Sequence, residues 1–156
     1  MRMGLTTAQH EARRTGIGSS EIAILAGVSP FKQTITDLYC RKLGLVEPEE
    51  ETEAMASGTW LEPVIRERYA RETGQRVMLA TEYYPDGVDG TIRHPLHSWA
   101  LATADGVVLK PTAPGATIVA DRLLEIKNGG ERASSHWTDE PDGVPVYYLC
   151  QVTWLM

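Results

Sequence analysis

Hydrophobic residues recur at intervals of three and four along much of the chain, and this spacing predicts helices. The predicted helices cover residues 21–26, from Thr34 or Thr36 to Leu43, 54–72, 133–137 and 144–156. Ser19 or Ser20 caps the first helix, and Gly27, Gly44 and Gly74 end the first three. Pro63 lies inside the third and predicts either a kink or a helix start near it.

From Gln75 onward the pattern changes to short apolar runs that are typical of strands. We expect strands at 76–80, 81–84, 99–103, 107–110 and 123–127. The sequence Ala104-Asp105-Gly106 between two of these runs predicts a hairpin turn. The order of helices, then strands, then helix predicts an α+β (mixed α/β) fold.

The length of 156 residues, with 42% hydrophobic and 23% charged residues, predicts one globular domain. We expect a flexible N-terminus at 1–12 and a single domain at 13–156. The last helix reaches Met156 without a capping signal, so we expect the domain to lack its C-terminal part. No apolar run is long enough to span a membrane, and no signal peptide is visible. The two cysteines fit a reducing compartment, so we expect a cytoplasmic protein.

The charge of the chain is unevenly distributed. The net charge is -6, which is not typical of a strongly basic nucleic-acid-binding protein. Residues 1–46 nevertheless carry six Arg and Lys against three Asp and Glu, whereas the remainder carries nine against eighteen. This division is compatible with a basic N-terminal part that contacts phosphate and an acidic remainder that binds metal. It is also compatible with ordinary solvated surface charge.

Three residues suggest metal-dependent hydrolysis. Asp105 lies on the predicted turn, and Glu125 and Lys127 are two positions apart in the last predicted strand, so their side chains share a face. Carboxylates suit Mg²⁺, which polarises a phosphoryl group and activates water, while a lysine orients that water. Alternating Glu and Lys on an exposed strand is also common without any such role.

The spacing of Asp105 and Glu125-Ile126-Lys127 resembles the core of the PD-(D/E)XK nuclease superfamily. Several flanking segments are similar to the YqaJ-like viral recombinase family, relatives of phage lambda exonuclease. These segments, which follow the family's order, are RRTGIGSSEI at 13–22, SPFK at 29–32, GTWLEP at 58–63, ATADG at 102–106, VPVYY at 144–148 and QVTWLM at 151–156. The resemblance implies a restriction-endonuclease-like core, with a central mixed sheet flanked by helices.

The resemblance also implies roles for individual residues. Asp105, Glu125 and the backbone carbonyl of Ile126 match the family's metal ligands, with Mg²⁺ or Mn²⁺ as the cofactor. Lys127 matches the catalytic lysine, and Gln151 a glutamine that positions the water or the lysine. Three further residues complete the set.

Glu62 matches an acidic residue that approaches the same site and is a further candidate metal ligand. Arg13 and Ser20 match positions that grip the 5′-phosphate of a DNA end. One departure is the stretch 93–97, which has no carboxylate where the lambda relative has a further aspartate. The two histidines there are poorly spaced for zinc.

The function implied is that of an exonuclease of the phage recombination type, encoded by a phage or its bacterial host. Such an enzyme degrades linear duplex DNA from the 5′ end and leaves a 3′ single strand for an annealing protein. Some family members form rings around DNA. The alternatives are a related endonuclease and a non-catalytic module that binds DNA ends. A Cas4-like enzyme needs a four-cysteine cluster, which two cysteines cannot supply.

Overall fold

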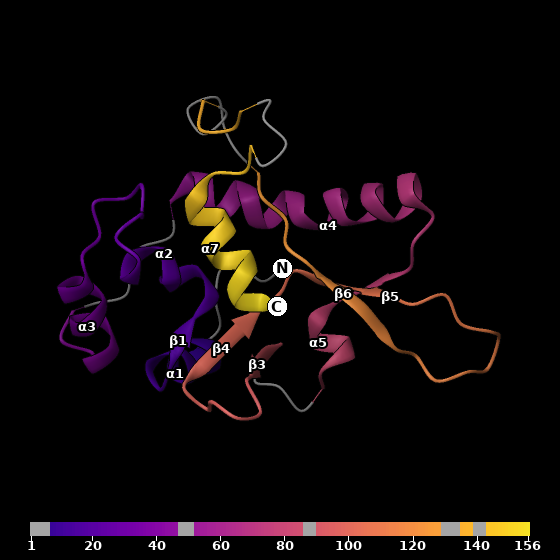
Figure 1. Ribbon diagram of the computed structural model, residues 1–156, viewed down its shortest axis with the longest axis horizontal. Coiled ribbons are helices and arrows are strands. Elements are labelled where there is room, and N and C mark those ends of the chain that lie inside the picture. The colour runs from indigo at the N-terminus through magenta and orange to yellow at the C-terminus, as the bar shows by residue number, and fades with distance from the viewer. Residues whose placement is uncertain (1–6, 47–51, 86–89, 129–134, 139–142) are drawn as a thin grey trace. The chain divides into compact units, whose positions relative to one another are not determined.

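The computed structural model describes residues 7–46, 52–85, 90–128, 135–138 and 143–156 (Figure 1). In chain order the helices are α1 (Thr7–Arg14), the 3₁₀ helix η1 (Ser19–Glu21), α2 (Ile22–Leu25), α3 (Ile35–Leu43), α4 (Glu53–Thr73), α5 (Ala80–Tyr83) and α7 (Val146–Leu155). The strands are β1 (Ile17–Gly18), β2 (Val77–Met78), β3 (Thr91–Arg93), β4 (Ala100–Thr103), β5 (Gly106–Leu109) and β6 (Ala120–Leu124). The predicted mixed α+β class is confirmed.

The chain divides into two compact units, each assembled from separate segments. The α4 unit comprises Met1–Gln9, Glu50–Ile92 and Thr103–Asn128, and the α7 unit comprises His10–Glu49, Arg93–Ala102 and Gly129–Met156. The strands form two three-stranded sheets, in the orders β1-β4-β3 and β2-β5-β6. Whether the units behave as the single domain predicted for 13–156 stays a prediction.

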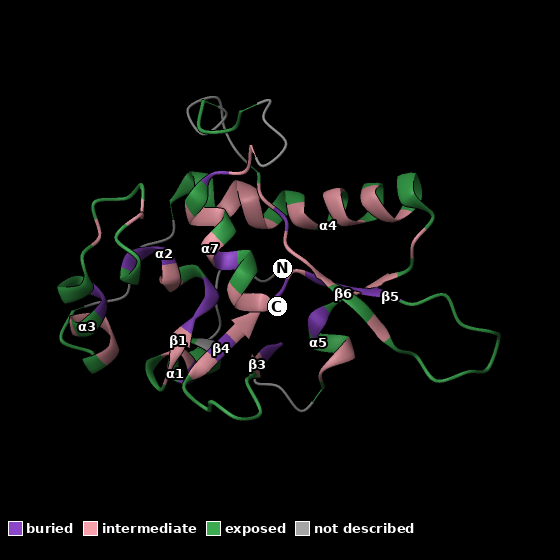
Figure 2. Ribbon diagram, in the orientation of Figure 1, coloured by how far each residue is buried: buried purple, intermediate pink, exposed green. Residues whose placement is uncertain are grey.

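The core of the α4 unit lies on β5, whose four residues are all buried (Figure 2). Val107 and Leu109 pack with Ala80 of α5 and with Ala104, and Met78 and Leu123 border this cluster. β5 is antiparallel to both of its neighbours, β2 and β6. Asp105 directly precedes this buried strand, and Glu125 directly follows its neighbour β6. The packing of β5 therefore determines where both residues lie.

In the α7 unit, β1 runs parallel to β4, and Leu101 of β4 is 1% exposed. Gly16 precedes β1 at a close approach, since a Cβ atom there would lie 2.9 Å from Cγ of Leu101 and would collide with the Trp99 carbonyl oxygen. The indole of Trp154 on α7 donates to the Leu101 carbonyl, with 2.9 Å between Nε1 and O. This bond ties the last helix to the strand.

The predicted helix ends agree closely with the structure. Thr34 caps α3 by accepting from the Asp37 amide, and Gly44 follows α3 in the left-handed region at φ 68°. Gly74 ends α4 in the same way, at φ 67°. Pro63 lies within a continuous α4 rather than at its start. The predicted helix at 133–137 falls partly outside the described residues.

Two other local predictions are wrong, at Ser19 and Ser20 and at residues 80–83. Ser19 and Ser20 do not cap α2, because they lie within η1 and Glu21 is the N-cap of α2. The N-cap of η1 is Gly18, whose amide donates to the Glu21 carboxylate over 2.7 Å. Residues 80–83 form α5 instead of a strand. α1 begins at Thr7 and Ala12 is buried, whereas residues 1–6 lie outside the described residues, so a flexible N-terminus at 1–12 stays a prediction.

The predicted hairpin at Ala104-Asp105-Gly106 is the most consequential error. β4 and β5 belong to different sheets, so this segment carries the chain from one sheet to the other. β6 also ends at Leu124 instead of continuing to Lys127.

In the part of the chain that the structure describes, every helix is too short or too polar to span a membrane.

Candidate functional site

Asp105 is held where the chain enters β5. Its amide donates to the Leu124 carbonyl at the end of β6, with 3.1 Å between N and O. Its carboxylate Oδ2 accepts from the amide of Ile126 over 2.6 Å. The two bonds join Asp105 to the chain on both sides of Glu125, so residues twenty positions apart in the sequence lie together.

Glu125 and Lys127 follow the last residue of β6 and form an ion pair. Lys127 Nζ lies 2.5 Å from Glu125 Oε1, and the side chains are 27% and 8% exposed, respectively. A lysine this close to a buried carboxylate compensates part of the cost of burying it. The side chains of Glu125 and Lys127 point toward each other, as expected, although both residues lie beyond the end of β6.

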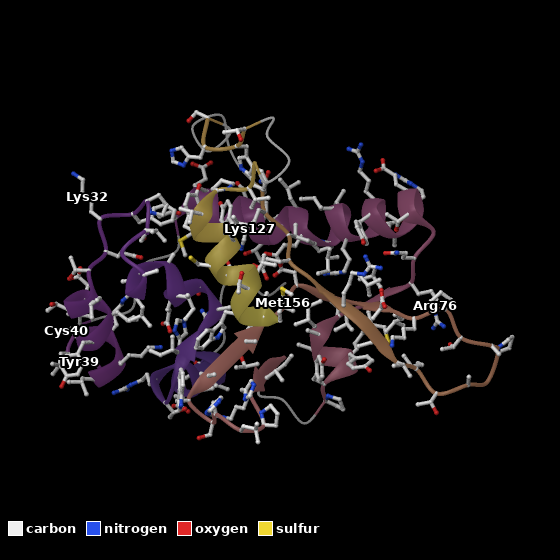
Figure 3. All side chains as sticks on the ribbon, viewed as in Figure 1. Lys32, Tyr39, Cys40, Arg76, Lys127 and Met156 are labelled. Carbon is white, nitrogen blue, oxygen red and sulfur yellow. The ribbon has the colours of Figure 1, made fainter. Side chains whose placement is uncertain are left out.

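Helix α4 contributes Glu62 and, one turn later, Arg66. Arg66 Nη1 donates to the main-chain oxygen of Asp105 over 3.2 Å. Figure 1 shows α4 above β5 and β6, and Figure 3 labels Lys127, whose charge acts on Glu62 of this helix. The sequence places Glu62 and Arg66 on one helical face because four residues are close to one turn.

The electrostatics show that these side chains lie within range of one another. Burial raises the pKa of Glu62 to about 7, with a further contribution from the negative charges of Asp105 and Glu125. Lys127 and Arg66 oppose that rise. Burial also raises the pKa of Asp105, against the lowering effect of the Ile126 amide and of the same two cations. The structure thus brings Glu62, Asp105, Glu125 and Lys127 together in one unit.

The donor chemistry of this cluster fits a hard divalent cation. Its oxygens come from three carboxylates, which are the ligands Mg²⁺ takes in proteins. Among the described residues no three His, Cys, Asp or Glu approach closely enough to form a ready-made metal cage. Mg²⁺ does not require one, since it usually binds one or two carboxylates together with water and substrate phosphate. Asp105 and Glu125, with the carbonyl of Ile126, would supply such a set.

Arg13 and Ser20 lie together in the α7 unit. Arg13 Nη2 donates to Ser20 Oγ over 3.0 Å. Beside them, Lys42 of α3 donates to Glu21 Oε2 over 2.6 Å and to the Arg13 main-chain oxygen over 2.5 Å. The predicted pair is therefore anchored by a second lysine–glutamate pair, in which the side chains are 15% and 16% exposed.

Gln151 belongs to the α7 unit, in the middle of α7, where it is 8% exposed. Its predicted role beside the water or Lys127 stays a prediction. Sequence analysis missed Arg66, Glu21 and Lys42. The spacing of four residues between Glu62 and Arg66 was the available signal for Arg66, whereas the pairing of Glu21 with Lys42 depends on tertiary packing.

Comparison with known proteins identifies related sequences and structures. The family profile of the YqaJ-like viral recombinase domain matches residues 9–156. The uncharacterized protein YqaJ of Bacillus subtilis (strain 168) is 28% identical over 141 residues, covering 90% of this chain and 38% of that protein. The crystal structure of LHK-Exo in complex with dAMP matches with a TM-score of 0.61 and 26% identity, over 97% of this chain and 67% of that one. This match supports the restriction-endonuclease-like core.

Proposed function

The chain belongs to the YqaJ-like viral recombinase family, and we propose that it is a Mg²⁺-dependent exonuclease that degrades linear duplex DNA from the 5′ end. The observation that carries this proposal is the cluster of Glu62, Asp105, Glu125 and Lys127, in which the Ile126 amide holds Asp105, Lys127 pairs with Glu125, and Glu62 lies within range of their charges. The chain spans 38% of the length of its curated relative, so an activity of that whole protein is not assumed for it.

The proposed reaction is hydrolysis of the phosphodiester bond that follows the terminal nucleotide. The oxygen of a water molecule bonds to phosphorus, the bond to O3′ of that nucleotide breaks, and O3′ takes up a proton. The products are a 5′-phosphorylated mononucleotide and a strand with a new 5′-phosphate. LHK-Exo was crystallised with dAMP, a compound of this product class, which supports the assignment.

The predicted site residues each have a part in this reaction. Asp105 and Glu125 would hold Mg²⁺, with the Ile126 carbonyl as a third ligand. When bound, the ion supplies Lewis acidity that polarises the phosphoryl group and lowers the pKa of a coordinated water. Lys127, held by Glu125, orients the attacking water and stabilises the negative charge that develops on the phosphoryl oxygens. Gln151 would position the water or Lys127.

Glu62 would be a further metal ligand of the same site, because its carboxylate is stabilised by a nearby cation. Burial and the neighbouring negative charges raise its pKa to about 7, so a divalent cation would favour the charged form by removing that repulsion. The Ile126 amide meanwhile fixes one oxygen of Asp105. The protein thereby orients part of the site before any ligand binds.

Arg13 and Ser20 would bind the terminal 5′-phosphate. A guanidinium offers a charge-assisted, forked set of donors to phosphate oxygens, and the hydroxyl adds another. Glu21 lies close to this pair, but its carboxylate is already engaged by Lys42 and the Gly18 amide. Recognition of the phosphate would direct hydrolysis to an end of the DNA.

The proposed partners are a single-strand annealing protein and further copies of the chain in a ring. The proposed location is the cytoplasm.

The test uses linear duplex DNA labelled at either end of one strand, with 5′-phosphate or 5′-hydroxyl ends, and a closed circle of the same sequence. With Mg²⁺ we expect each strand of the linear DNA to be degraded from its 5′ end, so that a 5′ label is released before a 3′ label. The circle should stay intact, and no reaction should occur in EDTA. Cutting of the circle would instead identify an endonuclease. End binding without cutting in Mg²⁺ or Mn²⁺ would identify a binding module, and either result overturns the proposal.

A further inference from the structure

We propose that Arg66 is a positioning residue that sets the metal affinity of the cluster by fixing the main chain of Asp105 to α4. The inference rests on the proposed function, because it concerns the Mg²⁺ site of the same nuclease. It assigns a role to a residue outside the set of Asp105, Glu125, Lys127, Gln151 and Glu62. Its starting point is the hydrogen bond from Arg66 Nη1 to the Asp105 oxygen, 3.2 Å long.

Asp105 is fixed at three atoms, and the three bonds have different origins. Its amide binds the Leu124 carbonyl and its carboxylate binds the Ile126 amide, so both of these partners belong to the segment at the end of β6. The third bond comes from Arg66, on α4. The β6 bonds place Asp105 beside Glu125, but only the Arg66 bond joins Asp105 to the helix that carries Glu62.

The packing around Arg66 keeps its side chain close to the sheet. A Cβ atom added to Gly106 would lie 3.5 Å from Cδ of Arg66, 3.0 Å from Cγ1 of Val77 and 3.3 Å from the Met78 oxygen. The two shorter distances are to β2, whereas 3.5 Å is an ordinary van der Waals distance, so the Arg66 stem lies next to Gly106 of β5. A half-buried arginine packed in this way loses less conformational entropy when it makes a hydrogen bond than a free surface arginine does.

Geometry and charge predict opposite effects of removing Arg66. Arg66 is a cation close enough to Glu62 and Asp105 to influence both. If its charge alone mattered, its removal would make the site more negative and strengthen Mg²⁺ binding. If Arg66 positions Asp105, its removal breaks the bond that joins Asp105 to α4, the helix that carries Glu62, and Mg²⁺ binding becomes weaker. Loss of a residue that orients metal ligands typically weakens binding or activity by about 10–100-fold.

The experiment measures Mg²⁺ binding by isothermal titration calorimetry, without DNA, for the wild-type chain, Arg66→Met and Arg66→Lys. Arg68→Met is the matched control, because Arg68 is on the same helix but exposed and paired with Glu72. Circular dichroism and urea unfolding establish that each variant is folded. The turnover of linear duplex DNA at saturating Mg²⁺ is measured in parallel.

We expect Arg66→Met to bind Mg²⁺ about tenfold more weakly than the wild type, Arg66→Lys to be intermediate, and Arg68→Met to be unchanged. The lysine is intermediate because it can donate one bond to the Asp105 oxygen. Equal or tighter binding by folded Arg66→Met overturns the inference while the wild type still binds and cuts. A loss of stability with unchanged Mg²⁺ affinity also overturns it, because that result indicates a purely structural role. A wild type that binds no Mg²⁺ overturns the proposed function and this inference together.

If Arg66→Met does not fold, Arg66→Lys decides the question. We then expect the folded lysine variant to bind Mg²⁺ more weakly than the wild type, although its charge is the same. Equal affinity would show that the site does not depend on the geometry of the guanidinium, and it would overturn the positioning role.

Discussion

Each unit contains a lysine paired with a glutamate, but the charges around the two pairs differ. Lys127 and Glu125 lie 2.5 Å apart in the α4 unit, where Glu62 and Asp105 add two more carboxylates and Arg66 adds one cation. Lys42 and Glu21 lie 2.6 Å apart in the α7 unit, where Arg13 and Arg41 add two more cations. The first pair has an excess of negative charge around it and the second an excess of positive charge.

This difference matches the ligand proposed for each place. A cluster with surplus carboxylates is stabilised by a cation, and a cluster with surplus cations by an anion such as a phosphate. The same lysine–glutamate pair can therefore serve either purpose, and the neighbouring residues decide which. Each pair also holds its lysine in a fixed place, which reduces the entropy lost when a ligand binds.

The largest expected effect comes from removing the lysine of the carboxylate-rich cluster. Lys127→Ala should lower the rate of DNA cleavage by about 10³-fold, because the attacking water loses its orienting group and the transition state loses a cation. Lys110→Ala, which changes an exposed lysine directly after β5, is the control and should cleave at the wild-type rate. A Lys127→Ala rate within tenfold of the wild type would remove this lysine from the mechanism.

The next effect concerns end recognition in the α7 unit. Arg13→Ala should reduce the preference for 5′-phosphate over 5′-hydroxyl ends by about tenfold or more, since a hydrogen bond to a charged group contributes about 1.5–3 kcal/mol. The measurement is the ratio of initial rates on the two substrates. Arg14→Ala, next to it but exposed, should keep the wild-type ratio. If both variants lose the preference equally, general basic charge rather than a built phosphate site is responsible.

Removing the other lysine should affect folding stability. Lys42→Met leaves the Glu21 carboxylate without its cation and the Arg13 carbonyl without its donor. We expect the free energy of unfolding to fall by about 2 kcal/mol in urea titrations. Lys32→Met, which changes an exposed lysine, should be neutral. Recovery of Lys42→Met stability by Mg²⁺ would contradict the assignment of the cation to the other cluster.

The smallest effect is the pH dependence contributed by Glu62. Its pKa is about 7 in the folded protein against an ordinary 4.5, so the folded state binds the proton more tightly than the unfolded state. The stability of the metal-free protein should therefore fall as pH rises through this interval. Glu62→Gln should remove part of that fall, about 1 kcal/mol after allowing for partial solvent screening.

Urea unfolding at pH 5 and pH 8 in EDTA measures this effect. The control is Glu67→Gln, which changes an exposed glutamate of the same helix and should keep the wild-type dependence on pH. An unchanged pH dependence in Glu62→Gln would show that the carboxylate is not destabilised by its neighbours.

The helices were largely predictable from the sequence because their signals are local. Thr34 and Gly44 define both ends of α3, and Gly74 ends α4. The strands were less predictable, since pairing depends on residues far apart in the sequence. Asp105 occupies a segment that carries the chain between two sheets, although its local sequence is typical of a hairpin.

The candidate site could be predicted in part. The resemblance placed Asp105, Glu125, Lys127 and Glu62 together, and the structure brings these four into one cluster. It could not show that Arg66 reaches the Asp105 oxygen, because that contact depends on how α4 lies along the sheet. Lys42 and Glu21 were missed for the same reason.

The most direct test of this division of charge measures two binding reactions on two variants. Mg²⁺ binding is titrated without DNA, and binding of a 5′-phosphorylated duplex end is titrated in EDTA. Asp105→Asn should lose Mg²⁺ binding and keep binding of the DNA end, whereas Arg13→Ala should keep Mg²⁺ binding and lose selectivity for the phosphate. If Asp105→Asn binds Mg²⁺ as the wild type does, the cation lies elsewhere and the account is wrong.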